Sequence, residues 1–414
     1  MDILKLISIL LVLIVKVKKI ICMDMYKENH IIKKRDILSD NFSSWIMPIK
    51  YQINDKDLIN ENVIKEAIKE IENNTCIRFN ETNLSANNTQ GIVFKLGKHC
   101  SSGVGRTFKN NTQVIQLTRD CSNKKGAVLH ELGHALGLVH EHCRTDRDSY
   151  VIVHKENILR EEKVNFEISN HSAYKNFSIS YDYSSIMHYE QFDFTNGLLF
   201  WWWYPVLESR LHPAYNRMMG QRLKMTFNDY KKLNLAYCKC NQTEKKETKK
   251  KEVTKKKEKK KKGPENGIRC RNGGYIASSN SSKCICPFGY TGNFCNETIK
   301  SDKNCNGTTF NVTTKDIKTH WIAGSYKCFF SFVTEKRKKI QLGIYQSYAP
   351  YSKICTEDIS HQIKYLKDKG TTGILLCSWR SDVINVTSED NSALIYFNGN
   401  SNNAFMQFGF KQVD

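Results

Sequence analysis

The segment from residue 130 to residue 148, HELGHALGLVHEHCRTDRD, restricts the fold and the chemistry of the chain more than any other stretch. It contains three histidines spaced i, i+4 and i+10, and a glutamate follows the first of them. Side chains four residues apart lie on one face of a helix, so His130 and His134 can direct their imidazoles at one metal ion. The spacing therefore predicts a helix that presents two metal ligands.

The third histidine reaches the same ion only if the chain turns back after this helix. Gly137 is the residue most able to adopt the left-handed conformation that ends a helix, and a turn there brings His140 to the other two. Three neutral nitrogens and one water form the open coordination typical of a catalytic zinc site. Glu131 is rotated away from the ligand pair, yet it lies beside the open position, where it can act on the water.

Two further motifs extend this pattern. SIMHY, at residues 185–189, supplies the methionine turn that accompanies HExxHxxGxxH in metzincin proteases. The residues after the third histidine continue the motif as HExxRxDRD. The combination HExxHxxGxxHExxRxDRD, followed by SxMHY, resembles the astacin family of zinc endopeptidases. A helix with buried histidines is a weaker interpretation, and a catalytically inactive relative is the alternative that we keep.

The resemblance implies an α+β metzincin fold, with a twisted, mostly antiparallel sheet, two long helices above it, and an irregular C-terminal subdomain beyond an open cleft. The hydrophobic patterns predict strands at 45–53, 75–81, 92–97 and 113–117, and helices at 63–72, 124–136 and 227–237. In the family, the strand that corresponds to 113–117 is the sheet edge that holds extended substrate. This is a general mode of recognition, in which a peptide adds to an exposed strand.

The resemblance also implies a role for each residue of the site. One zinc ion per chain is bound by three ligands: His130, His134 and His140. Glu131 is the general base, and Tyr189 binds zinc at rest and then swings away to stabilise the oxyanion. Three residues support the site structurally: Gly137, Met187 and Glu141. By resemblance, Glu141 accepts the free amine of a mature chain that begins at Asp36.

Fifteen cysteines and more than a dozen Asn-x-Ser/Thr sequons are typical of a secreted, glycosylated protein. The apolar run at 3–15 is shorter than the roughly 20 residues that span a bilayer, so we interpret residues 1–23 as a signal peptide. A basic cluster directly after this run keeps an uncleaved signal anchor as the alternative. Residues 24–35 end in Lys-Lys-Arg and are interpreted as a short propeptide. We expect a secreted protein without a stable membrane span.

Composition and motifs divide the rest of the chain. Residues 36–240 are the predicted peptidase domain, and 241–265 form a lysine-rich linker that cannot bury a core. Residues 266–297 resemble an EGF-like module in which two of the usual six cysteines are missing. Residues 305–412 resemble a CUB domain, which is a β-sandwich with two local disulfides.

The cysteines can be assigned to pairs by these resemblances. Fourteen remain if Cys22 leaves with the signal peptide, which is an even number. Five pairs are implied directly: Cys100–Cys121, Cys270–Cys284, Cys286–Cys295, Cys305–Cys328 and Cys355–Cys377. Cys76 is implied to pair with Cys240 or Cys238, near the end of the peptidase domain. Cys143 is unusual for the family, and we predict an extra bridge from it to whichever of Cys238 and Cys240 remains.

The net charge of +21 raises nucleic acid as a partner, but twelve lysines fall within residues 245–262 alone, and no nucleic-acid-binding motif accompanies them. We therefore predict protein or peptide substrates, with extracellular matrix or cuticle proteins as candidates, and no nucleic acid. The aromatic run around Trp201–Trp203 is a candidate substrate-facing wall or a patch for a partner, and burial against the subdomain is the alternative. The competing hypothesis is a secreted binding or adhesion protein on an inactive scaffold.

Overall fold

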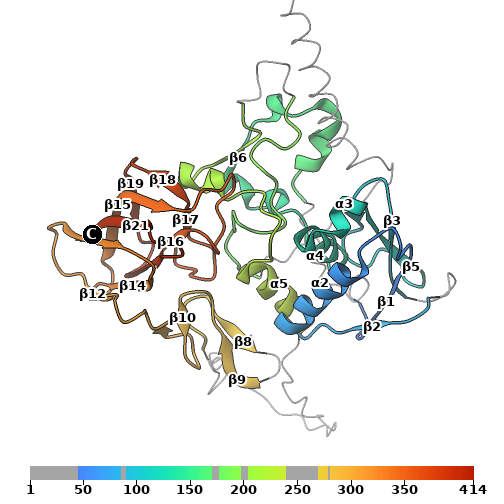
Figure 1. Cartoon of the computed structure of the whole chain (residues 1–414), viewed down its shortest axis with the longest axis horizontal. Helices are drawn as coiled ribbons and strands as arrows, with labels where there is room; N and C mark the ends of the chain where they lie inside the picture. The colour runs from blue at the N-terminus through green and yellow to red at the C-terminus, as the bar shows by residue number, and fades with distance from the viewer. Residues whose placement is uncertain (1–44, 85–89, 170–176, 197–203, 239–268, 278–279) are drawn as a thin grey trace, which may run out of the picture.

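The structure is a computed structural model of the 414-residue chain and describes residues 45–84, 90–169, 177–196, 204–238, 269–277 and 280–414. The expected signal peptide, propeptide and linker, and Trp201–Trp203, lie outside these residues. Figure 1 shows three parts: an N-terminal α+β part (45–238), a small module (269–299) and a C-terminal part rich in β-strands (305–414). No helix within the described ranges is long and apolar enough to cross a membrane.

The N-terminal part is built on a five-stranded sheet in the order β2-β1-β3-β5-β4. Its strands are β1 (Ile49–Ile53), β2 (Phe79–Glu81), β3 (Gly91–Leu96), β4 (Ser101–Ser102) and β5 (Thr112–Leu117). β1 pairs in parallel with β2 and β3, β3 pairs in parallel with β5, and only β4 runs antiparallel to its neighbour. The prediction of a mostly antiparallel sheet is therefore wrong. A helix joins β1 to β2, and such a crossover lets the next strand run in the same direction.

The edge of this sheet also differs from the expectation. Residues 113–117 fall in β5, whose outer side is covered by β4, with Ser101 opposite Gln116 and Ser102 opposite Ile115. The edge strand is therefore β4, and the prediction that 113–117 is the edge is wrong. A strand of two residues inside a loop is too short to give a readable hydrophobic pattern.

Two helices form one apolar core with the sheet. α2 (Glu61–Asn74) is capped by Asn60, whose side chain accepts a hydrogen bond from Val63 N at 3.2 Å. Its buried residues have the i, i+3, i+4, i+7 spacing of a single face: Ile64, Ala67, Ile68 and Ile71. α4 (Lys125–Ala135), which follows the short α3 (Arg119–Ser122), is buried along its whole second half.

Between α4 and α5 (Phe227–Tyr237) the chain is mostly irregular, as expected. β6 (Val151–Val153) pairs with β7 (Leu207–Ser209) in a two-stranded antiparallel sheet. Short 3-10 helices lie at Glu141–Cys143, Arg147–Ser149, Lys155–Asn157, Arg160–Phe166 and Pro213–Arg217.

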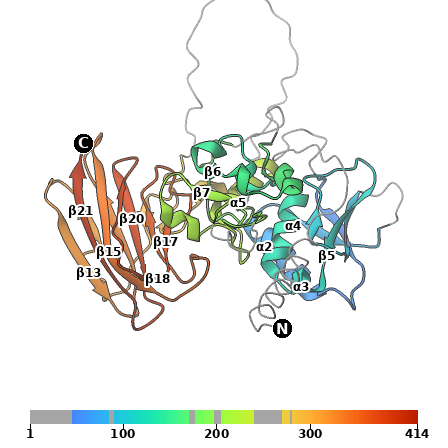
Figure 2. The same cartoon turned by 90° about the horizontal axis from the view of Figure 1, so that it is seen from above.

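The C-terminal part is a sandwich of two sheets, seen beside the N-terminal part in Figure 2. The first sheet contains, in order, β12 (Thr309–Asn311), β14 (Lys327–Val333), β20 (Ser392–Asn398), β16 (His361–Lys364) and β17 (Ile374–Leu376). The second contains β13 (Lys318–Ala323), β21 (Phe405–Val413), β15 (Lys339–Ala349) and β18 (Ser378–Arg380), and β19 (Ile384–Thr387) also pairs with β15. Phe330 of the first sheet packs on Phe408 of the second, with ring centroids 5.2 Å apart.

The sandwich and the N-terminal part share one continuous apolar core. At the junction, Arg217 Nη2 donates to Ser352 O at 2.6 Å and to Ser378 Oγ at 3.1 Å. Met218 is fully buried there, and its sulfur accepts a hydrogen bond from Leu375 N at 3.3 Å. The two parts are therefore expected to unfold together.

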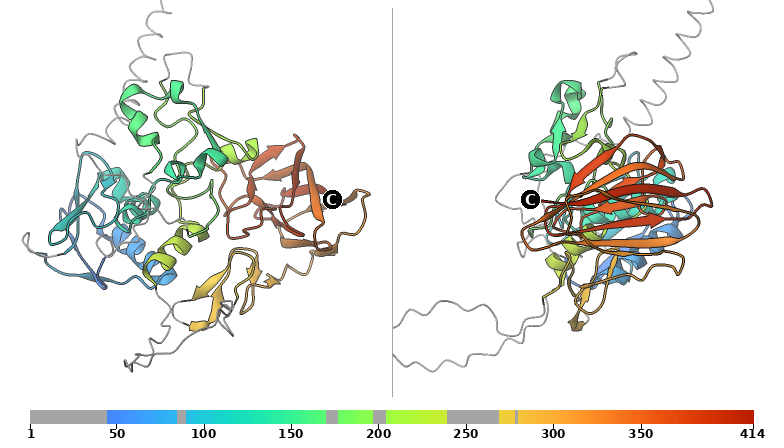
Figure 3. Two further views of the ribbon diagram at one scale, coloured as in Figure 1. Left: turned by 180° about the vertical axis from the view of Figure 1, so that it is seen from behind. Right: turned by 90° about the vertical axis from the view of Figure 1, so that its left-hand side faces the viewer.

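The small module contains the pairs β8 (Tyr275–Ala277) with β9 (Asn280–Ile285) and β10 (Tyr290–Thr291) with β11 (Glu297–Thr298). Figure 3 shows it below α5 and the sandwich, and it contacts both. Lys231 Nζ of α5 donates to Gly273 O at 2.8 Å, and Phe288 packs against Tyr396 of the sandwich with ring centroids 4.8 Å apart.

The shared core leads to a first prediction, on Met218→Ala. The substitution leaves a cavity at the junction and should lower the free energy of unfolding by about 2–5 kcal/mol. Chemical denaturation followed by fluorescence measures this, and a single transition is expected because the core continues through both parts. Leu223→Ala is the control, since Leu223 is 57% exposed and its loss should cost no more than about 0.5 kcal/mol. Equal effects of the two substitutions would contradict a packed junction.

Candidate metal centre

The centre is built on the second half of α4, which carries His130, Glu131 and His134. The helix ends as predicted, because Gly137 has a φ of 100°. Its N–H donates to His134 O at 2.8 Å, and Leu138 N donates to Gly133 O at 2.8 Å. These two bonds form a Schellman motif, which reverses the chain and returns it towards the helix.

The remaining carbonyls at this end of α4 are satisfied from distant segments. Trp45 Nε1 donates to Ala135 O at 2.7 Å, and Tyr237 OH of α5 donates to Leu136 O at 3.0 Å. A helix end leaves its last carbonyls without intrahelical donors, so each such bond is a fixed point. The position of the two ligands on α4 is thus set by Trp45 and by α5.

The three histidines converge as the sequence predicted. Their ligand nitrogens all lie within 4.8 Å of one another, and the Nε2 atoms of His134 and His140 are 3.1 Å apart. His130 Nδ1 lies 2.9 Å from Ile186 O, and His134 Nδ1 lies 2.8 Å from Leu138 O. A carbonyl only accepts, so both Nδ1 atoms carry protons and both Nε2 atoms present lone pairs. This donor set fits a zinc ion.

The electrostatic environment keeps these rings neutral, as metal ligands must be. Burial lowers the pKa of His134 to about 4. Burial also lowers the pKa of His130 and His140 well below the ordinary value, and the neighbouring histidines add to the shift of His140. All three imidazoles therefore keep a free lone pair at neutral pH.

Glu131 lies next to the first ligand and is 4% exposed. Its Oε2 has no hydrogen-bond partner among the described residues. Burial raises the pKa of Glu131 to about 8, although the positive charge of Arg222 opposes the shift. An unpartnered buried carboxyl beside three convergent imidazoles is unusual, because such a group is costly unless another group occupies the site.

Tyr189 and Met187 surround the histidines from the other side. The Tyr189 ring lies 4.3 Å from the His140 ring and 4.2 Å from that of His142, measured between centroids. Met187 is 1% exposed. Its sulfur packs so close to Gly133 of α4 that a Cβ atom at this position would lie only 3.0 Å from it. Met187 is therefore packed against the helix that carries two of the ligands.

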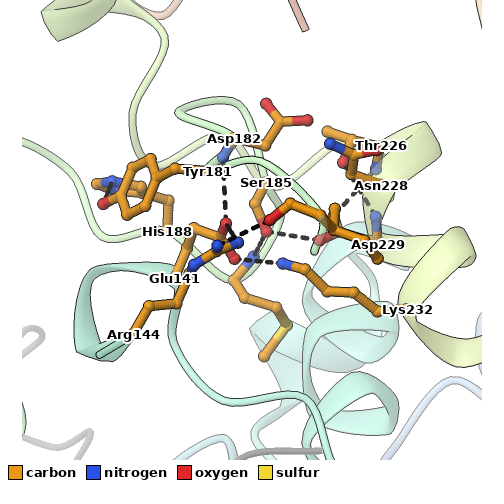
Figure 4. Close-up of polar contacts among 12 residues, drawn as sticks. Glu141, Arg144, Tyr181, Asp182, Ser185, His188, Thr226, Asn228, Asp229 and Lys232 are labelled. Carbon is orange, nitrogen blue, oxygen red and sulfur yellow. Dashed lines mark hydrogen bonds and ion pairs between the residues drawn. The ribbon is translucent and has the colours of Figure 1, made fainter. Parts of the chain in front are cut away.

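Glu141, which follows the third ligand, is the centre of a buried polar network (Figure 4). Its Oε1 accepts hydrogen bonds from Arg144 Nη1 at 2.9 Å and Asp182 N at 3.1 Å, and its Oε2 accepts one from Lys232 Nζ. Burial would raise the pKa of Glu141, but the charges of Lys232 and Arg144 outweigh burial and lower it to about 2. Residue 36, whose amine was expected here, lies outside the described residues, and Lys232 already occupies Oε2.

Asp229 of α5 holds the methionine turn. Ser185 Oγ donates to Asp229 Oδ1 at 2.6 Å, and Ile186 N donates to Oδ2 at 3.1 Å. Ile186 O is the acceptor for His130 Nδ1, so Asp229 acts on the first ligand through one residue. A local signal for this carboxylate is present in the sequence, because Thr226 and Asp229 form a capping box at the start of α5.

Six disulfides join described cysteines, and one of them decides between the two predicted partners of Cys76. Five are the pairs implied by resemblance: Cys100–Cys121, Cys270–Cys284, Cys286–Cys295, Cys305–Cys328 and Cys355–Cys377. The sixth joins Cys76 to Cys238, with a Cα–Cα distance of 5.7 Å, so a Cys143–Cys238 bridge is wrong. Cys143 is buried, and its Sγ donates to Asn165 O at 3.1 Å. Cys240 lies outside the described residues.

The α+β fold and this centre together place residues 45–238 in the class of zinc metallopeptidases. A family model described as Astacin, a family of peptidases, matches residues 38–238. These residues form a domain of the astacin family, and the resemblance first seen in the motif is confirmed.

Named relatives extend this similarity beyond the domain. Zinc metalloproteinase nas-34 of Caenorhabditis elegans is 28% identical over 374 residues, which cover 88% of this chain and 55% of that protein. Zinc metalloproteinase dpy-31 of Teladorsagia circumcincta is 31% identical over 271 residues, which cover 64% of this chain and 39% of that protein. The chain spans about half the length of the curated relatives that it matches. High choriolytic enzyme 1, a hatching enzyme zinc-protease from Oryzias latipes, is a solved structure with 28% identity and a TM-score of 0.40; the match covers 52% of this chain and 99% of that one.

The contact between α5 and the methionine turn leads to a second prediction. Asp229→Asn loses one acceptor oxygen and should release Ile186, so that His130 is no longer oriented. We expect zinc to bind about 10- to 100-fold more weakly, which is typical when the partner of a ligand is removed. Competition with a chromophoric chelator measures the Kd. Asp120→Asn, at a side chain that is 75% exposed, is the control and should leave the Kd unchanged. An unaltered Kd in Asp229→Asn would show that His130 is held without α5.

A third prediction concerns pH. Asp182 is fully buried and accepts hydrogen bonds from Ser184 N and from Thr372 N and Oγ1 of the sandwich. Burial, and then the negative charges of Asp229 and Glu141, raise its pKa from 3.8 to about 7. Between these two values the folded chain binds a proton that the unfolded chain has lost. The contribution of Asp182 to the free energy of unfolding is therefore present at low pH and is lost as pH rises towards 7.

Asp182→Asn should remove this dependence. Urea denaturation of both metal-free proteins between pH 5 and pH 8 measures it, and the free energy of unfolding should fall less steeply in the variant. Parallel curves for the two proteins would show that Asp182 is ionised throughout.

Proposed function

We propose that this chain is a secreted zinc-dependent endopeptidase that hydrolyses peptide bonds of extracellular proteins. The observation that carries the proposal is the combination of three imidazoles whose lone pairs converge and a buried Glu131 carboxyl without a partner among the described residues. The names of the relatives, zinc metalloproteinases, support the same activity.

His130, His134 and His140 would hold the metal, and Glu131 would act as the general base. Zinc, when bound, polarises the scissile carbonyl and lowers the pKa of its water to about 7. The charge of a bound zinc ion would favour the ionised form of Glu131, whose Oε2 would then accept a proton from the attacking water and pass it to the leaving amine. Tyr189, which packs against His140, donates its hydroxyl proton in a hydrogen bond to the developing oxyanion. Met187 and Glu141 keep the ligand loops in place.

The substrate would bind in extended form along β4, the edge strand on the β5 side of the sheet. The loop that follows β4 leads directly to the centre, because Gly105 N donates to His134 O at 2.8 Å. A peptide that adds to the free edge of Ser101–Ser102 would therefore lie on a strand whose next loop contacts the helix that carries two of the histidines. Main-chain hydrogen bonds of this kind bind many sequences, as an endopeptidase requires.

The two C-terminal parts would serve as binding modules for extracellular partners. The small module has the two disulfides expected of an EGF-like unit that lacks two of the usual six cysteines. The sandwich has the two local disulfides expected of a CUB domain. Disulfides of this number are typical of secreted proteins. Matrix and cuticle proteins are the substrates that we propose, and mapping of cleavage sites by mass spectrometry would identify the preferred sequence.

A fourth prediction tests the activity through Glu131→Gln. The amide has the same shape but cannot accept the proton, so kcat should fall by about 10²- to 10⁴-fold while zinc binding is retained. A fluorogenic peptide library measures hydrolysis, and bound zinc is measured by elemental analysis. Glu66→Gln, at an exposed position of α2, is the control and should leave kcat unchanged.

Chelation gives the complementary arm of this test. A chelator should abolish hydrolysis by the wild-type protein, and added zinc should restore it. A wild-type protein that binds one zinc ion and cleaves no peptide of a broad library would favour the competing hypothesis, a binding or adhesion protein on an inactive scaffold.

A further inference from the structure

Lys232 is almost completely buried, although lysine is rarely found inside a protein. The residue is 9% exposed, and it lies on α5, in the sequence segment Phe227–Tyr237. Its ammonium group contacts Oε2 of Glu141, a carboxylate that is 1% exposed (Figure 4). The two residues are 91 positions apart, so the contact is a product of the fold.

The charges around Glu141 show why this lysine is required. Arg144 also contacts Glu141, but its Nε and Nη2 donate to both oxygens of Asp146 at 2.8 Å. Without Lys232, the buried carboxylate of Glu141 would share the single positive charge of Arg144 with Asp146, whose side chain is 31% exposed. A buried charge is tolerated only when it is paired and hydrogen-bonded.

The pair lies where it can position the third zinc ligand. Glu141 directly follows His140, and its own N–H donates to Met187 O at 3.1 Å. Asp229, one turn before Lys232 on the same face of α5, holds the methionine turn through Ser185. One face of α5 therefore fixes both the loop of His140 and the turn that orients His130.

We propose that Lys232 is a positioning residue of the zinc site, whose ammonium, together with Arg144, neutralises Glu141 and thereby holds the His140 loop without the free amine of a mature amino terminus. The inference rests on the proposed zinc chemistry and adds a property to it. The resemblance implied that the free amine of a mature chain supplies this cation. Here the cation is internal, so assembly of the site does not depend on how the amino terminus is processed.

The test uses the full chain with Lys232→Met, Lys232→Arg and the double substitution Glu141→Gln/Lys232→Met. Lys232→Met should weaken zinc binding about 10- to 100-fold, as the loss of a supporting partner does. Lys232→Arg keeps the charge and should restore the Kd to within about threefold of the wild type. The double substitution removes both charges. On a logarithmic scale, it should recover more than half of the zinc affinity that Lys232→Met loses. The zinc Kd is measured by chelator competition, separately from kcat and KM.

Lys125→Met is the matched control, because Lys125 forms an ion pair with Glu70 at 2.7 Å but its side chain is 42% exposed. An exposed pair contributes little, so this variant should bind zinc as the wild type does. A further arm compares two forms of the wild-type protein, one that begins with a free amine at Asp36 and one with extra residues before Asp36. Both should have the same zinc Kd and the same kcat.

Three results would overturn the inference: wild-type zinc affinity in Lys232→Met, no recovery in the double substitution, or a zinc affinity that falls tenfold or more when residues precede Asp36. If Lys232→Met does not fold, the arginine variant, the double substitution and the comparison of the two amino termini decide the question. A wild-type protein that binds zinc but cleaves no peptide would count against the proposed activity and not against the role of Lys232.

Discussion

The metal centre depends on two hydrogen bonds in which backbone carbonyls accept protons from Nδ1 of His130 and His134. These bonds fix the tautomer of each ring and direct both Nε2 lone pairs at one point. Each carbonyl is held in turn by the fold. Leu138 belongs to the Schellman motif that ends α4, and Ile186 is held by Asp229 of α5. The geometry of the ligands is therefore a result of tertiary packing.

Local sequence patterns predicted the part of this arrangement that depends on neighbouring residues. The part that depends on long-range contacts could not be predicted from them. The ligand spacing, the turn at Gly137 and the bounds of α5 could be read because each depends on neighbours within a few residues. Strand direction could not be read, because it depends on how the crossover through α2 returns to the sheet. The predicted Cys143–Cys238 bridge was wrong, because disulfide pairing depends on distances in the folded chain. Lys232 gave no signal at all, because its partner is 91 residues away.

The sandwich contacts the N-terminal part more extensively than a tethered module would. Its apolar core continues into the N-terminal part, and Thr372 donates two hydrogen bonds to Asp182, which itself donates its N–H to Glu141. A path of two residue contacts, Thr372 to Asp182 and Asp182 to Glu141, thus connects the sandwich to the loop of the third ligand. Binding of a partner to the sandwich acts on the centre only if it alters one of these contacts, which restricts where such coupling can occur.

Zinc K-edge X-ray absorption on the zinc-loaded protein tests the central claim most directly. Our account predicts three nitrogen scatterers at about 2.0–2.1 Å, together with light-atom scattering from solvent or Tyr189. Cys143 lies three residues after His140 and offers a competing sulfur donor, within 4.8 Å of a nitrogen of that ring. A sulfur scatterer at about 2.3 Å would place the ion on Cys143 and contradict the account.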